Sequence, residues 1–412
     1  MKPLITVSIT LLMSTTAFAV EPVGAETFNT DPGFDLATLT ADNFYDVIVP
    51  LAKKEGSLTF YDFTDSFGPL FTEHLIPAFE AKYGLSVTYI RGEGAAANQQ
   101  LIAAHNSGAK APADAYFVSS GGLPLLGEAG VIANIPLATV LPSGAGIEPR
   151  IATVTGGIEH GGTFLPFHRN QTSIVYNSSM VEDAPSNLDE LATWAQANPG
   201  KFIVTSPAGG GSGNGFMQTI AFAKVTDEAC RATFVQYDIT KEEADAFAAS
   251  DCMKPVWDYY STLLPVVEIT NGNSDTLNLL ANGAGSIGTA WEDMTYDFTG
   301  RGLLPPTVRQ TLLEEGQVGG GDGMFLPVNG TSPAAGLLLL DFLMSQEVQL
   351  QKLELNGSRS ARTDIDPAAS FTPEQVARLI PTEEFATRAL ERMPAVLNDQ
   401  LSAYFVANIL AK

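Results

Sequence analysis

Residues 56–90 read GSLTFYDFTDSFGPLFTEHLIPAFEAKYGLSVTYI and contain two short strand patterns separated by a helical one. The strands are predicted at 58–61 and 85–90, where β-branched and aromatic residues are frequent. Apolar residues between Phe71 and Tyr83 recur on one helical face, and Pro77 is expected to kink or shorten this helix. This order predicts parallel strands joined by a right-handed crossover.

A second step of the same kind follows, with a helix predicted at 95–107 and a strand at 115–118. Ligands of parallel α/β sheets bind beyond the carboxyl ends of the strands. The polar residues that follow the first and third strands are therefore candidate ligand-binding residues: Thr64, Asp65, Ser66, Ser119 and Ser120. Capping of the next helix explains each of them equally well.

A second α/β region begins after two extended segments at 163–167 and 173–176, which are expected to cross between domains. It contains a capping-box-like pair, Ser186 and Asp189, before a helix, and a strand at 202–204. The glycine-rich loop SPAGGGSGNG (206–215) precedes a helix expected from Phe216, and a later strand at 285–290 runs into Trp291-Glu292-Asp293.

Length and charge restrict the function. A chain of 412 residues is too long for one ordinary core and predicts two domains. The formal net charge of −24 opposes binding to nucleic acid and to anionic membranes, and favours cationic partners. Solubility in an acidic or saline habitat explains this charge as well.

The N-terminus has the pattern of a cleavable export signal. Lys2 precedes an apolar stretch from Leu4 to Met13, and Ala17-Phe18-Ala19 is a typical cleavage site. The apolar stretch is too short to span a bilayer. The sequence therefore predicts a signal peptide at 1–19 and a protein that functions in the periplasm.

Cys230 and Cys252 are the only cysteines, and an exported compartment permits a disulfide between them. They have no CxxC spacing, and a structural zinc site needs four ligands. We expect a disulfide, no metal and no cofactor.

Seven segments resemble, in order, the extracellular solute-binding proteins of bacterial ABC importers, nearest the polyamine, thiamine and ferric-iron subgroups. They are GSLTFYDFTDSFGPL (56–70), FEAKYGLSVTY (79–89), ADAYFVSSGGL (113–123), FLPFHRNQTSIVYNSSMV (164–181), PSNLDELATWAQANPGKFIVTSP (185–207), GAGSIGTAWEDM (283–294) and FLPVNGTSPAAGLLLLDFLMSQEVQ (325–349). The resemblance implies an α/β fold of the two-lobed, type II periplasmic-binding-protein kind, with a small-molecule ligand in the cleft and an ABC permease as partner. We expect a monomer.

The predicted domain ranges follow from this resemblance. They are an N-terminal extension at 20–44, a first lobe at 45–163 plus 291–348, and a second lobe at 164–290 plus 349–412. The first crossing is expected near 164–174 and the second near Trp291.

Trp291 and Asp293 are the strongest ligand-binding candidates. An aromatic face beside a carboxylate suits an organic cation, and polyamine-binding relatives use a Trp and a nearby acid at this strand end. Packing of the ring at the hinge is the alternative.

The loop at 206–215 lacks the acidic residues that polyamine-binding relatives place there. Its glycines, with Ser212 and Asn214, favour an anionic or neutral ligand group. A thiamine-like ligand would satisfy both features; a tight turn needed by the fold is the other explanation of the loop.

Arg169 lies in the expected first crossing. It is predicted to pair with a ligand carboxylate or phosphate, or with Asp293 across the hinge, and the sequence does not choose between them.

Enzymatic motifs are absent from the sequence. The four histidines have no HExxH spacing, and GGSGN (210–214) lacks the last glycine of a GxSxG nucleophile elbow. The alternatives to a transport protein are a ligand-binding subunit of a sensor or chemoreceptor and, less favoured, an exported hydrolase.

Overall fold

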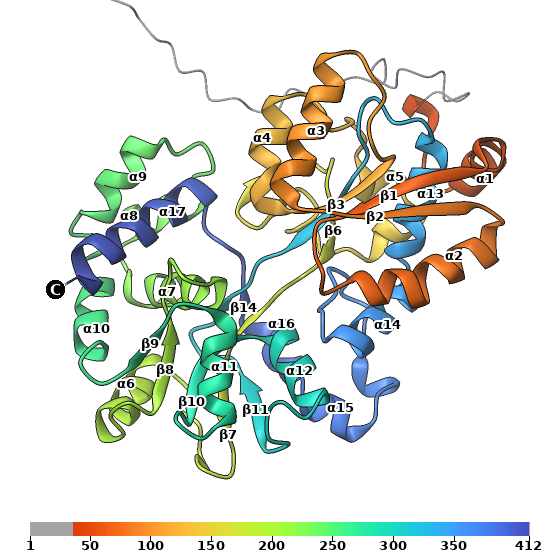
Figure 1. Cartoon of the computed structure of the whole chain (residues 1–412). Coiled ribbons are helices and arrows are strands. Elements are labelled where there is room, and N and C mark those ends of the chain that lie inside the picture. The colour runs from red at the N-terminus through yellow and green to blue at the C-terminus, as the bar shows by residue number, and fades with distance from the viewer. Residues whose placement is uncertain (1–35, 412) are drawn as a thin grey trace, which may run out of the picture.

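A computed structural model describes residues 36–411, so the predicted signal peptide and the first part of the predicted extension lie outside the described residues. The described chain forms two lobes, each built on a five-stranded sheet with helices around it (Figure 1).

The first sheet has the strand order β2-β1-β3-β13-β6. Its strands are β1 (Ser57–Asp62), β2 (Ser86–Arg91), β3 (Ala115–Ser119), β6 (Leu165–His168) and β13 (Asp322–Phe325). β1 pairs in parallel with β2 and β3, whereas β13 runs antiparallel to β3 and β6. The carboxyl ends of β1 and β3 therefore meet at one edge, beside the start of β13.

Seven helices accompany this sheet. They are α1 (Phe44–Glu55), α2 (Ile76–Tyr83), α3 (Gly94–Asn106), α4 (Leu123–Glu128), α5 (Leu137–Val140), α13 (Pro333–Leu343) and α14 (Gln346–Asn356). A π-helical segment, Leu70–Leu75, leads into α2, and Pro77 lies in the first turn of α2, where its missing N–H is tolerated. All of α13 is buried, which explains its strongly apolar sequence.

The predicted extension at 20–44 does not continue as a loop. α1 follows directly from Phe44, and the buried positions Phe44, Ile48 and Ala52 recur every four residues and join the core of the first lobe. Pro50 lies inside this helix, and because proline disfavours a helix interior, the sequence pattern does not predict a helix here.

The second sheet has the order β11-β7-β10-β8-β9. Its strands are β7 (Thr172–Asn177), β8 (Phe202–Thr205), β9 (Glu268–Thr270), β10 (Ile287–Trp291) and β11 (Val308–Thr311). β8, β9 and β10 are parallel, and β7 runs antiparallel to β10 and β11. Its helices are α6 (Leu188–Ala197), α7 (Gly211–Lys224), α8 (Glu228–Ala232), α9 (Lys241–Ala248), α10 (Lys254–Leu263), α11 (Asn273–Ala281), α12 (Glu292–Gly300) and α17 (Ala395–Tyr404).

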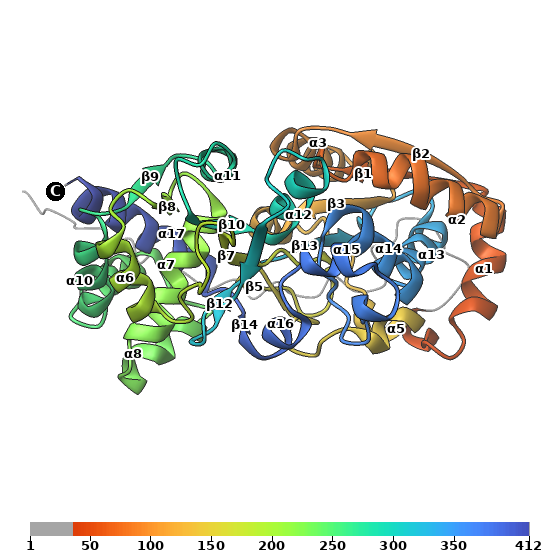
Figure 2. The ribbon, with the colours of Figure 1, turned by 90° about the horizontal axis from the view of Figure 1, so that it is seen from below.

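Smaller elements complete the described chain. A hairpin of β4 (Val154–Thr155) and β5 (Ile158–Glu159) precedes β6, and β12 (Gln317–Val318) pairs with β14 (Ala389–Leu390) beside α15 (Pro373–Ala377) and α16 (Thr382–Arg388). Short helical turns occupy Leu36–Thr38, Ser120–Gly122, Pro142–Gly146, Thr233–Val235, Pro367–Ala369 and Phe405–Leu410. Figure 2 shows α12 and α16 near the junction between the lobes.

The strand pairing corrects the predicted lobe boundaries at 164, 291 and 349. β6 pairs with β13 of the first sheet, so the chain first crosses after His168. β10 and β11 both pair with β7, so the second crossing follows Thr311 and does not lie near Trp291. α14 packs on α13 in the first lobe, and a third crossing, between β14 and α17, returns the C-terminus to the second lobe (Figure 1).

One predicted helix start is also shifted. The N-cap of α6 is Asn187, whose side chain accepts a hydrogen bond from the Glu190 N–H at 2.9 Å, and not Ser186. Ser186 instead donates to the Glu190 carboxylate. Asp189 is therefore in the first turn without a reciprocal capping bond.

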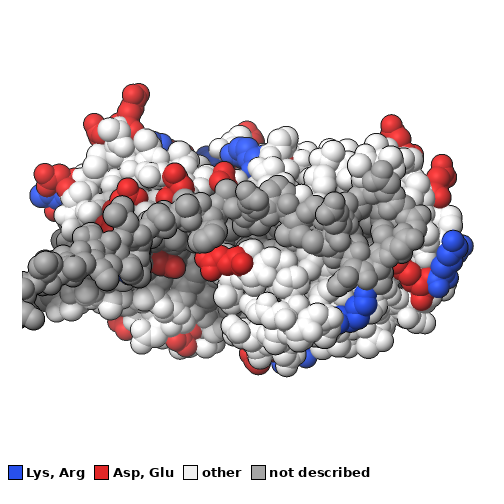
Figure 3. Space-filling view, turned by 90° about the horizontal axis from the view of Figure 1, so that it is seen from above, with Lys and Arg blue, Asp and Glu red and all other residues white. Residues whose placement is uncertain are grey.

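The surface is consistent with the acidic composition. Asp and Glu side chains are more frequent than Lys and Arg on the face in Figure 3. Within residues 36–411, no helix has both the length and the apolar character needed to cross a membrane.

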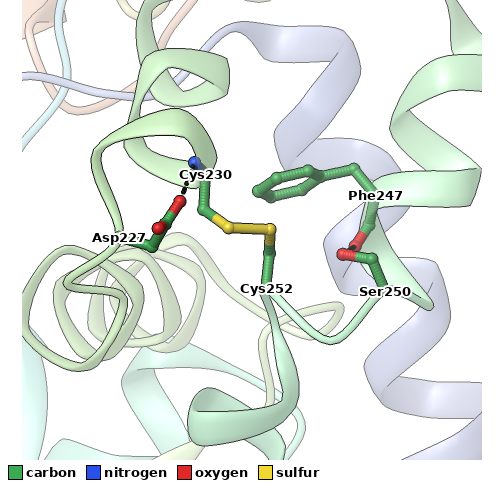
Figure 4. Close-up of a disulfide and its surroundings, with 5 residues drawn as sticks. All are labelled: Asp227, Cys230, Phe247, Ser250 and Cys252. Carbon is green, nitrogen blue, oxygen red and sulfur yellow. Dashed lines mark hydrogen bonds between the residues drawn. A yellow bond between two sulfur atoms is a disulfide. The ribbon is translucent and has the colours of Figure 1, made fainter.

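Cys230 and Cys252 form a disulfide on the second lobe, with Cα atoms 5.6 Å apart. Figure 4 shows the Phe247 ring next to it, and the Cys230 N–H donates to Asp227 at 3.0 Å. The bond links the start of α8 to the loop before α10.

Replacing both cysteines by serine should lower the free energy of unfolding by ~3 kcal/mol, because closing a loop of about twenty residues removes entropy from the unfolded chain. Urea unfolding of the oxidised wild type and of the double variant measures the difference. Thiol labelling of the native, unreduced protein should modify neither cysteine; modification of both would contradict the bond.

Candidate ligand site between the lobes

The carboxyl end of β3 meets the start of β13 in a polar contact. The Ser120 N–H donates to Asp322 Oδ1 at 3.2 Å, and the Ser119 side chain also bonds this carboxylate. Burial raises the pKa of Asp322 to about 6, although these hydrogen bonds and the charge of Arg392 oppose the rise. Ser119 and Ser120, both predicted from the sequence, therefore surround a carboxylate that the sequence analysis did not single out.

Trp291 ends β10 in the second lobe and is 8% exposed. A Cβ atom on Gly211, the first residue of α7, would clash with its indole ring, so the ring lies directly against the start of this helix. The guanidinium carbon of Arg392 lies 5.8 Å from the ring centroid. Trp291 thus contacts a helix start of the second lobe and the third crossing segment.

Arg392 lies between the two lobes. Its Nε donates to the Gly319 carbonyl at 3.3 Å, and its charge interacts with Asp322 at the first sheet and Asp399 on α17. Neither Arg392 nor Asp322 belongs to a sequence motif. The one local feature of the sequence that could have indicated this site is the glycine-rich run VGGGDG (318–323) around Asp322. Its Gly320 leaves room for the guanidinium of Arg392, where a Cβ atom would be crowded.

Asp293 lies in the first turn of α12 and lines a pocket of about 520 Å³ between α12 and the first lobe. Asp65 and Ser66 line the same pocket from the loop after β1. Asp293 Oδ2 is 3.8 Å from His168 Nε2, whereas its buried Oδ1 finds no hydrogen-bond partner among the described residues. Burial is the main cause that raises the pKa of Asp293 to about 7, with Glu292 adding repulsion.

The other residues of the loop after β1 mostly bond one another. The hydroxyl oxygens of Thr64 and Ser66 are 2.7 Å apart, and the Thr64 N–H donates to Asp62. Asp65 pairs with Arg91 at 2.6 Å on the exposed surface. Of the three predicted residues, Asp65 and Ser66 share the pocket with Asp293, and Thr64 supports the turn.

Ser212 and Asn214 point into the second lobe. α7 begins at Gly211, so half of the predicted loop is helical; Gly213 permits this close approach because a Cβ there would clash with the Thr205 carbonyl. Ser212 is fully buried, and its hydroxyl donates to Asn273 at 2.8 Å. Asn214 donates to Ser402 of α17 at 2.9 Å. We therefore leave both residues out of the candidate site.

Arg169 does not pair with Asp293, one of the two partners expected for it. It pairs with Glu148 at 2.5 Å and Glu391 at 2.7 Å and is 7% exposed. His168, one residue earlier, is the one that approaches Asp293. Arg169 thus holds the first and third crossings together.

A second buried ion pair, between Arg359 and Glu292, lies near Arg169. Arg359 donates to both carboxylate oxygens of Glu292, at 2.9 and 2.8 Å, and Glu292 also accepts from the Ile380 N–H at 2.7 Å. The Phe385 ring lies 5.0 Å from the guanidinium carbon of Arg169 and 4.5 Å from that of Arg359. We call Glu292, Arg359, Phe385, Arg169, Glu148 and Glu391 the junction cluster.

A metal site is not evident in the described part of the chain, where no group of three His, Cys, Asp or Glu residues is placed to hold an ion.

This architecture, two hinged α/β lobes with polar strand ends facing the junction, is that of a solute-binding protein. The family model for bacterial extracellular solute-binding proteins matches residues 74–378, and the chain belongs to this family. No curated protein matches the sequence.

Solved structures support the fold. An ABC transporter protein from Clostridium perfringens is 14% identical with a TM-score of 0.63, covering 86% of this chain and 99% of that one. The spermidine/putrescine substrate-binding protein PotD of Streptococcus pneumoniae is 15% identical with a TM-score of 0.61 and coverages of 85% and 97%. The GacH receptor of Streptomyces glaucescens, solved with acarbose, is 15% identical with a TM-score of 0.62 and coverages of 84% and 93%. At these identities the similarity shows the fold and not the ligand.

Replacing Arg359 by methionine should lower the free energy of unfolding by ~3–5 kcal/mol, because Glu292 would stay buried without its partner. Lys254→Met is the matched control: it removes an exposed i,i+4 pair with Asp258 and should cost at most ~0.5 kcal/mol. Chemical unfolding measures both variants, and equal losses would show that the buried pair has no special role.

Proposed function

We propose that this protein captures one small polar solute bearing an organic cationic group in the periplasm, after export by the signal at 1–19, and delivers it to an ABC permease. It acts by binding alone, without a catalysed reaction or cofactor. Membership of the extracellular solute-binding family supports the capture role. The polyamine-binding structure among the similar folds is in keeping with a cation, whereas the acarbose-binding one is not.

The observation that carries the choice of a cation is the carboxylate of Asp293. The Asp293 side chain is 23% exposed and lines the pocket, and its buried Oδ1 lacks a hydrogen-bond donor among the described residues. An ammonium group is a donor of matching charge, and binding it would satisfy an atom that is otherwise costly to bury. Asp65 and Asp297 line the same pocket, although Arg91 pairs with Asp65 and Arg301, which also lines the pocket, pairs with Asp297.

Residues from both lobes form the candidate site, and this favours capture by hinge closure. Ser119, Ser120 and Asp322 come from the first lobe, and Trp291 from the second. A ligand that bonds both sides shifts the population toward the closed form by its difference in affinity for the two forms. A micromolar affinity corresponds to about −8 kcal/mol, more than one cation–π contact of ~1–2 kcal/mol supplies, so several polar groups must converge.

Replacing Trp291 by alanine should weaken binding of the preferred amine at least tenfold, which corresponds to losing ~1.4 kcal/mol of contact with the indole face. Titration calorimetry of the wild type and the variant measures this. Trp194→Ala on α6 is the matched control, since Trp194 packs against the core of the second lobe. If only the control lost affinity, Trp291 would not belong to the site.

Affinity for an amine should rise between pH 5 and pH 8, tenfold or more, because Asp293 must lose its proton before it pairs with an ammonium group, and its pKa is about 7. The charged and titratable groups that face it are Glu292, Asp322, His168 and Lys352. The amine stays protonated over this range. Asp293→Asn should bind more weakly at pH 8 and lose most of the pH dependence; Asp322, with a pKa of about 6, accounts for what remains below pH 6.

Without ligand, the same raised pKa predicts the opposite trend for stability. The unfolded chain releases the Asp293 proton near the ordinary pKa of an aspartate, and the folded chain keeps it until about pH 7. Stability is therefore greatest below the unfolded pKa and falls as the pH rises toward 7, and thermal unfolding of wild type and Asp293→Asn across this range tests it. A wild type with the same pH profile as the variant would contradict the assignment.

A further inference from the structure

We infer that Arg392 forms a second subsite, for an acidic group, so that the natural ligand carries both an amine and a carboxylate, phosphonate or phosphate. This inference rests on the proposed function, because it adds an acid-binding subsite to the cation-binding one at Asp293.

Arg392 has side-chain N–H donors that no described residue accepts. Its Nε atom bonds the Gly319 carbonyl at 3.3 Å, but neither Nη atom forms a hydrogen bond, or an ion pair within 4 Å, with any residue in the described range. The other arginines at the junction differ. Arg169 uses its Nη atoms on Glu148 and Glu391, and Arg359 donates to Glu292 and the Ile380 carbonyl. Arg392 is half-buried and keeps the fork of donors that suits a planar or tetrahedral acid.

Two neighbours of Arg392 also suit an acid, whereas the nearby carboxylates of Asp322 and Asp399 oppose one. The guanidinium lies over Trp291, 5.8 Å from the ring centroid, an arrangement that orients its plane. The start of α7, which has 14 residues, lies against the same ring at Gly211, and the positive end of this helix dipole adds to the charge of Arg392. These features support the acid-binding subsite. The main evidence for it is that the Nη atoms of Arg392 have no bonding partner among the described residues.

The acid-binding and amine-binding groups are linked through Trp291, because Arg392 lies 5.8 Å from the centroid of its ring and Asp293 follows it by two residues. The charge of Asp322 interacts with both Arg392 and Asp293. Asp322 is bonded by Ser119 and Ser120 in the first lobe, whereas Trp291 and Asp293 belong to β10 and α12. A ligand with opposite charges at its two ends would therefore meet both lobes and the third crossing segment at once.

Three compounds with the same four-carbon backbone test this. Putrescine carries two amines, 4-aminobutanoate one amine and one carboxylate, and succinate two carboxylates; 2-aminoethylphosphonate extends the amine–acid class. Titration calorimetry at pH 8 should give the highest affinity for an amine–acid compound, at least tenfold above putrescine and succinate.

Arg392→Gln should weaken the amine–acid compound at least tenfold and leave putrescine within about twofold, and Arg392→Lys should restore part of the loss because it keeps the charge without the fork. Arg231→Gln, at an exposed arginine on α8, is the matched control and should change neither affinity. Thermal unfolding without ligand verifies that each variant is folded.

The outcomes separate the two proposals. Tightest binding of putrescine, unaffected by Arg392→Gln, would overturn the acid subsite and leave the proposed cation capture standing. Tightest binding of succinate would overturn the role of Asp293 and, with it, the amine–acid ligand. If none of the amines bound to the folded wild type, both proposals would fail.

Discussion

The buried pair of Glu292 and Arg359 is the interaction on which the junction depends. Both side chains are almost fully buried, so neither charge is tolerable without the other, and the backbone N–H of Ile380 completes the coordination of the carboxylate. Glu292 stands between Trp291 and Asp293. Anchoring this one residue therefore fixes the turn from β10 into α12, and with it the positions of Trp291 and Asp293, the two side chains proposed to bind the ligand. A flexible hinge needs such a rigid reference point if its ligand groups are to keep their geometry.

Around this anchor the junction uses charges in two ways. In the junction cluster, Arg169 and Arg359 are matched by three carboxylates and flank the Phe385 ring, so the first and third crossings are tied together. At the candidate site, Arg392 forms no ion pair within 4 Å among the described residues, and burial leaves Asp293 and Asp322 with raised pKa values. Polar groups that lack full hydrogen bonding in the protein alone are the ones whose interactions a ligand can improve, and this agrees with the proposed capture by hinge closure.

The errors of the sequence analysis share one physical cause. Ser212 and Asn214 looked like residues of an exposed glycine loop, but the glycines serve to bring α7 against β8, which turns both side chains inward. Arg169 was expected to pair with a ligand group or with Asp293, but its partners are Glu148 and Glu391, which lie 21 and 222 residues away along the chain. The lobe boundaries were misplaced because β11 pairs with β7 and β13 with β6, and local patterns contain no information on such pairings. A polar residue shows its chemistry in the sequence, but not its partner.

The sequence by itself determined the strand and helix order, the two α/β units, the family and the Trp291–Asp293 pair at a strand end. These follow from local periodicity and short segments, in which each residue's neighbours are known. Only the tertiary structure decided that Asp322 and Arg392 join this pair, that Glu292 is an anchor and that the chain crosses between the lobes three times. These features depend on contacts between residues far apart in the sequence, such as Glu292 with Arg359, 67 positions away, and Arg169 with Glu391, 222 positions away, and only folding brings those residues together.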